Sequence, residues 1–126
     1  MRARRMRHPT PRPGMSFVAA GGALLAAAAV ALAAYAAHAA SPAAQMRLYT
    51  AAAFAFGHGA MLAAVAPATA GRCARTGMFA MLVGSLLFAG SLALAAFVQA
   101  PTTLAPTGGV MLIGAWLLLA IDRLGY

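Results

Sequence analysis

Four long apolar blocks, separated by short stretches that hold polar residues and prolines, run along the chain. They cover about residues 15–37, 46–66, 77–98 and 104–121. Each block comes close to the roughly 20 apolar residues that a helix needs to cross a bilayer. The pattern therefore predicts an all-α membrane protein whose four transmembrane helices run up, down, up and down in one bundle.

The blocks differ in how strongly they favour insertion. The third holds ten strongly apolar residues, whereas the second holds five and also carries Arg47 and His58. A weak span depends on contacts with other helices, and small residues recur on one face of the second block: Ala53, Gly57, Ala60 and Ala64. Another small set shares a face of the third block: Ala80, Gly84, Ser91 and Ala95. Because small residues let helices approach closely in lipid, we expect close packing along both faces.

Residues between the blocks predict the helix ends. Ser41 followed by Pro42 is typical of a helix start, because serine caps free backbone N–H groups and proline suits the first helical position. Residues 67–76 are expected to form a loop, and residues 99–106 an uncharged hinge. The last helix is expected to begin near Thr107, after a segment from Leu104 that sits at membrane depth.

The composition excludes an ordinary soluble domain. Of the 126 residues, 63% are hydrophobic and 8% are charged, against roughly 25% charged residues in soluble domains. Lysine is absent, Asp122 is the only acidic residue, and the formal net charge is +8. The arginines lie at the edges of apolar blocks, which is a membrane pattern, so the lipid bilayer is the expected partner and nucleic acid is not.

Arginine placement predicts the orientation in the membrane. Residues 1–14 are rich in arginine and proline and are expected to form a disordered cytoplasmic tail, followed by one transmembrane domain over residues 15–126. With the N-terminus inside, eight arginines are cytoplasmic and only Arg47 is outside, so both termini are expected in the cytoplasm. The alanine-rich, lysine-free usage is typical of a GC-rich bacterial genome and points to the bacterial inner membrane. Cleavage of the first block as a signal peptide, after Ala37-His38-Ala39, stays open as an alternative.

The chain lacks the residues that catalysis and metal binding require. Asp122 supplies the only side-chain carboxylate and Cys73 the only thiol, so neither a paired acid and base nor a cysteine metal site can be built. His38 and His58 are expected about 15 Å apart along the bundle, too far for a shared ligand. No base is placed to activate Ser91. We therefore expect no enzyme, cofactor or metal site.

Three motifs carry a family resemblance. They are Ala34-Tyr35-Ala36-Ala37-His38-Ala39, Phe54-Ala55-Phe56-Gly57-His58, and Leu87-Phe88-Ala89-Gly90-Ser91-Leu92 followed by Pro106-Thr107-Gly108-Gly109 and Gly114-Ala115-Trp116. Over about residues 17–121 the chain resembles the YgdD-like family of small inner-membrane proteins, a domain of unknown function. The chain departs from the family pattern at Ala55, Ala89 and Ala93, where relatives carry Gln, Ser and often Tyr. The resemblance implies a membrane protein and no established activity.

Eight residues are candidates for function or for close packing: His38, His58, Gly90, Ser91, Pro106, Gly108, Gly109 and Trp116. His58 is expected near mid-membrane, where an ionisable side chain is a functional hypothesis by default. Its alternative role is a neutral imidazole bonded to a carbonyl or hydroxyl group of a neighbouring helix, such as that of Ser91.

Two functions fit these residues. The first is an accessory protein that packs, through its glycine and alanine faces, against other membrane proteins or against itself. The alternative is a minimal homo-oligomeric transporter or channel that uses His58, Ser91 and a helix break at Pro106–Gly109.

Overall fold

The protein is an all-α bundle in the computed structural model, which describes residue 10 and residues 12–125. Four α-helices follow one another along the chain: α1 (Pro13–His38), α2 (Pro42–Val65), α3 (Arg72–Val98) and α4 (Leu104–Arg123). A short 3-10 helix, η1 (Ala66–Ala68), continues from α2. The described residues form no strand, and all four α-helices are long and apolar enough to cross a membrane. The predicted four-helix membrane fold is confirmed.

Helices α1 and α3 begin earlier than predicted, and α2 begins at the predicted residue. α1 begins at Pro13, where the fixed backbone angle of proline suits a first helical position. The rest of the predicted disordered tail, apart from residues 10 and 12, lies outside the described residues. α2 begins as predicted, with Pro42 first and the Ser41 hydroxyl accepting the Ala44 N–H at 3.4 Å. α3 begins at Arg72, so the predicted loop is too long at its end, and residues 72–76 are helical.

The predicted helix break at Pro106–Gly109 is wrong. α4 is continuous from Leu104 to Arg123, and Pro106 is its third residue. The N–H groups of the first turn of a helix have no acceptor within the helix, so a proline there removes no hydrogen bond. The hinge is therefore shorter than predicted, and it leaves α3 through Gln99, whose φ of 55° lies in the left-handed region.

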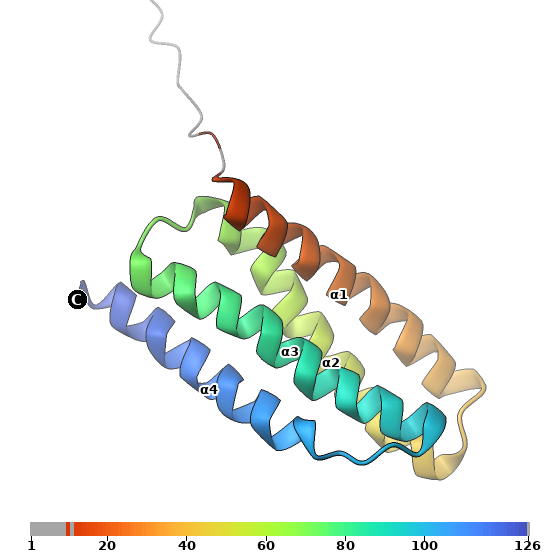
Figure 1. Ribbon diagram of the computed structural model, residues 1–126. Helices are drawn as coiled ribbons and strands as arrows, with labels where there is room; N and C mark the ends of the chain where they lie inside the picture. The colour runs from red at the N-terminus through yellow and green to blue at the C-terminus, as the bar shows by residue number, and fades with distance from the viewer. Residues whose placement is uncertain (1–9, 11, 126) are drawn as a thin grey trace, which may run out of the picture.

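The helices form two antiparallel hairpins, α1–α2 and α3–α4, which Figure 1 shows side by side. Contact between α2 and α3 joins the hairpins, while α1 meets α3 over a much shorter stretch. α4 packs mainly on α3, on the side away from α1. α3 is consequently the most enclosed helix: 39% of an 18-residue apolar stretch of α3 is buried, against 22% of the corresponding stretch of α1.

Glycines set the distance between the helices of each hairpin. A Cβ atom on Gly22 of α1 would lie 2.6 Å from the Gly59 carbonyl oxygen of α2. In the second hairpin, a Cβ atom on Gly108 of α4 would lie 2.5 Å from the backbone nitrogen of Phe88. Real Cβ atoms do not approach that closely, so both crossings require glycine. In lipid, burial of apolar surface does not drive helices together, so the close van der Waals packing at these crossings stabilises the hairpins instead.

One end of the bundle carries most of the charge. Arg12, Arg72, Arg75 and Arg123 lie there, at the start of α1, the start of α3 and the end of α4. Asp122, the only acidic residue, accepts the backbone N–H of Ala74 at 3.2 Å. Since Gly71, the N-cap of α3, has no capping side chain, the carboxylate from α4 caps α3 in its place and complements the positive end of that helix. We call this the arginine-rich end.

Candidate functional site

His58 and Trp116 form a hydrogen-bonded pair between α2 and α4. The Trp116 Nε1–H donates to His58 Nε2 at 3.2 Å, and His58 Nδ1 lies 2.7 Å from the Phe54 carbonyl oxygen one turn earlier in α2. An indole nitrogen only donates and a carbonyl only accepts. In this arrangement His58 Nε2 accepts the hydrogen bond from Trp116, and Nδ1 donates to the Phe54 carbonyl.

Aromatic rings surround this pair and link three helices. The Phe54 ring stacks on the His58 ring with centroids 5.8 Å apart, and it meets the Phe88 ring of α3 at 4.5 Å. The pair faces outward, because His58 is only half-buried and Trp116 is 48% exposed. His58 is hydrogen-bonded, as one of its two predicted roles requires, but its carbonyl partner belongs to its own helix, and its neighbouring-helix partner is the Trp116 indole and not a carbonyl or the Ser91 hydroxyl.

The serines of α3 lie elsewhere, inside the bundle. Ser91 is 6% exposed and Ser85 is fully buried, and neither hydroxyl has a hydrogen-bond partner. Ser91 therefore does not serve as the predicted partner of His58. Its place on a buried face of α3, together with Gly84 and Ala95, agrees with the predicted small-residue packing.

The candidate glycines separate into two kinds. Gly108 is buried, and a side chain there would collide with the backbone of α3. A Cβ atom on Gly109 would make an ordinary contact of 3.8 Å with the Phe88 ring, and one on Gly90 would meet nothing within 4 Å. Pro106 is exposed in the first turn of α4. Of these four candidates, only Gly108 is required by packing within the chain.

His38 and His58 are not brought together. His38 is the exposed last residue of α1, and His58 lies sixteen residues beyond the start of α2 at Pro42, or about 24 Å along the helix. Within the described part of the chain, no three His, Cys, Asp or Glu side chains gather in a way that could hold a metal ion. Cys73 is half-buried in the first turn of α3.

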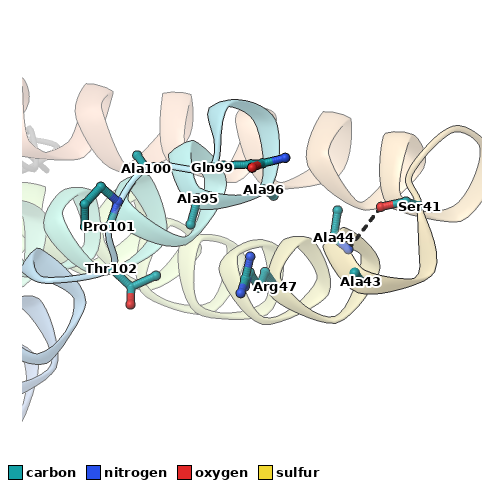
Figure 2. Close-up of a pocket in the computed structure, with 10 residues that line it drawn as sticks. All are labelled: Ser41, Ala43, Ala44, Arg47, Ala95, Ala96, Gln99, Ala100, Pro101 and Thr102. Atoms are coloured by element: carbon teal, nitrogen blue, oxygen red, sulfur yellow. Dashed lines mark hydrogen bonds between the residues drawn. The ribbon is translucent and has the colours of Figure 1, made fainter.

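An open polar pocket of about 490 Å³ lies at the other end of the bundle. Figure 2 shows its lining, which comes from the first turns of α2 and from the end of α3 with the following hinge. Ser41, Arg47, Gln99 and Thr102 supply its polar side chains. The sequence predicted only that Arg47 lies on the outer side and that residues 99–106 form an uncharged hinge. The pocket was not predicted, because residues 41–47 and 95–102, which line it, are far apart in the chain.

The family described as protein of unknown function (DUF423) matches residues 32–109, more than half of the chain. The chain belongs to the DUF423 family. The matched residues run from the end of α1 to the Gly108 crossing and include His38, His58 and Ser91. No curated protein and no solved structure matches this DUF423 chain.

Proposed function

We propose that this DUF423 protein is an accessory protein of the bacterial inner membrane, which binds another membrane helix or a second copy of itself through the outer face of α2. We also assign it to the YgdD-like branch of the family, on the motifs described above. The biochemical role of such a protein is to hold a partner in place, and it needs no catalytic group.

The main support for this proposal is that a row of small residues on α2 is exposed on the outside of the bundle. The small residues predicted to pack closely do not face the bundle: Ala53, Gly57, Ala60 and Ala64 are all exposed. A Cβ atom on Gly57 would meet nothing within 4 Å. These four residues form a small-residue stripe, and exposed aromatic side chains flank it: Phe54 is 40% and Phe56 52% exposed. Small-xxx-small spacings between larger neighbours are how membrane helices admit a second helix at close range.

The outward-facing His58–Trp116 pair supports the same face. His58 directly follows Gly57 in α2 and accepts the hydrogen bond from Trp116 of α4. A polar pair that faces hydrocarbon is unfavourable, and a protein partner relieves that cost. The transporter alternative has less support, because α4 is unbroken and Ser91 is enclosed while His58 faces outward.

Crosslinking in intact membranes tests this proposal. We expect a crosslinked product of defined mass, either twice the chain or the chain plus one partner. Gly57→Leu places a large side chain in the middle of the stripe, and it should reduce the product about tenfold or more, as expected for a misfit at the centre of an interface.

Gly114→Leu is the matched control. Gly114 also has nothing within 4 Å of its Cβ position, but it lies on α4. Gly114→Leu makes the same chemical change away from the small-residue stripe of α2, so it should leave the amount of crosslinked product unchanged. A wild-type chain that gives no product, or equal losses in both variants, would contradict the proposal. Substrate flux that His58→Ala abolishes, with unchanged assembly, would favour the transporter.

A further inference from the structure

We propose that one anionic phospholipid binds lengthwise between α1 and α3, with its phosphate at Arg72 and Arg75 and an acyl chain in the apolar groove that begins there. This site lies apart from the α2 stripe, so it extends the proposed function without depending on it.

The acyl-chain part of the site is a groove of about 530 Å³ between α1 and α3. It forms because these two helices meet only over a short stretch. Gly21 and Leu82 lie in contact across it, since a Cβ atom on Gly21 would be 3.1 Å from a Leu82 methyl group. Phe17 and Leu24 line it and are 70% and 71% exposed. The groove is therefore apolar and open along its length.

The phosphate part is a smaller cavity of about 260 Å³, lined by Arg72, Arg75, Thr76 and Phe79. Phe79 also lines the apolar groove, so the two cavities meet at this ring. The Arg75 Nε atom is buried and has no hydrogen-bond partner. Asp122, the only acidic residue of the chain, is already bonded to the Ala74 backbone. Two guanidinium groups thus line one cavity, and the group that pairs best with them is an anion with several acceptor oxygens, such as a phosphate.

The length and direction of the combined site identify a phospholipid. Along α1 the groove extends from Phe17 to Ala28, eleven residues or about 17 Å. One leaflet of the hydrocarbon core is about 15 Å deep, half of the roughly 30 Å bilayer core. The cations lie at the arginine-rich end, at headgroup level, and the groove runs from them toward the bilayer centre. A soluble anion matches only the first part of this arrangement, whereas an anionic lipid matches both.

A tryptophan at the junction of the two cavities gives a direct readout. In a Trp116→Phe background, Phe79→Trp places the only indole of the chain at the ring that both cavities share. The protein is reconstituted in vesicles that contain phosphatidylglycerol or phosphatidylcholine brominated near the headgroup end of the chain. We expect phosphatidylglycerol to be preferred at this position about tenfold, because each arginine beside an anionic headgroup contributes a preference of roughly fivefold before screening.

Phe97→Trp in the same background is the control for position. Phe97 lies on the same face of α3 eighteen residues later, is 50% exposed, and has Tyr35 as its aromatic neighbour. A tryptophan there should show no preference between the two lipids. Equal preference at Phe79 and Phe97 would overturn the site, because it would show only general attraction of anionic lipid to a basic protein.

Charge variants then test the two arginines. Arg72→Gln with Arg75→Gln should remove the preference at the Phe79 position, and the Lys pair at the same places should restore most of it. Arg123→Gln removes a charge from the same end on α4 and should leave the preference within about twofold, since Arg123 does not line the cavity. A preference that survives the double Gln variant, or that Arg123→Gln abolishes equally, would overturn the proposal.

Discussion

The two hairpins of the bundle solve the same packing problem with different tolerance. In α1–α2 the crossing is reciprocal, because a Cβ atom on Gly22 or on Gly59 would lie 2.6 Å from the carbonyl oxygen of the other. In α3–α4 it is one-sided. A Cβ atom on Gly108 would lie 2.5 Å from the Phe88 nitrogen, but one on Gly84 would lie 3.1 Å from its nearest neighbours. The first hairpin leaves no room on either helix, while the second leaves some room on α3.

Each hairpin also has one side chain that bonds the backbone of its partner helix. In α1–α2, Gln45 Nε2 donates to the Ala36 carbonyl at 2.9 Å, next to the connecting turn. In α3–α4, Asp122 bonds the Ala74 N–H at the end farthest from the hinge. The second hairpin is therefore closed at both ends. The stability of α1–α2 therefore depends mainly on its glycine crossing, whereas in α3–α4 a helix cap also contributes to stability.

The largest expected effect is at the reciprocal crossing. Gly59→Ala should lower the free energy of unfolding by about 2–3 kcal/mol, because an added methyl group meets the backbone of α1 and overpacking of a tight core typically costs about 1–3 kcal/mol. The gain in helix propensity from alanine offsets only part of this. Unfolding in mixed detergent micelles with increasing sodium dodecyl sulfate measures the change.

Gly84→Ala is the matched control within the second hairpin. A Cβ atom on Gly84 would lie 3.1–3.2 Å from the Gly108 carbonyl oxygen, Met111 Cβ and Leu112 Cγ, so a shift of a few tenths of an ångström is enough to accept it. We expect it to cost less than about 1 kcal/mol. If Gly84→Ala destabilised the protein as much as Gly59→Ala does, the contrast between the two crossings would be lost.

The cap between α4 and α3 gives the next largest effect. Asp122→Ala should cost about 1 kcal/mol, the usual loss when a helix loses its capping side chain. A Cβ atom on Gly71 would collide with the Asp122 carboxylate, so Gly71→Ala should be destabilising in the wild-type chain and much less so beside Asp122→Ala. Additive losses in the double variant, measured by the same unfolding assay, would show that the two residues act separately.

Sequence pattern predicted the number of helices and most of their extent, because membrane insertion depends on apolar length alone. It did not predict which face of each helix is buried. Lipid is as apolar as the bundle interior, so the small residues of α2 and α3 look alike in sequence. Gly84 and Ser91 are buried in α3, while Gly57 and Ala60 of α2 are exposed. The false break at Pro106 has a simpler cause, since proline interrupts a helix only beyond its first turn.

The candidate site was predictable only in part. A histidine within an apolar block identifies His58 directly, and a hydrogen bond to a neighbouring helix was one of its two predicted roles. Its partner was hidden, because Trp116 is 58 positions away and lies on a helix that packs mainly on α3. The cavity lined by Arg72 and Arg75 was hidden for another reason: residues 72–76 were expected in a loop. Only when they form the first turns of α3 do Arg72 and Arg75 line one cavity with Phe79.

The smallest expected effect concerns a bond that links the two hairpins in addition to the contact between α2 and α3. The His58–Trp116 bond joins α2 to α4, two helices with little other contact. A double-mutant cycle with His58→Leu and Trp116→Phe should give a coupling free energy of about 0.6 kcal/mol, the average for hydrogen bonds between membrane helices. A value near zero would leave the pair as mere neighbours. A coupling as large as the Gly59→Ala effect would mean that this one bond holds α4 to α2 as firmly as the glycine crossing holds α1 to α2.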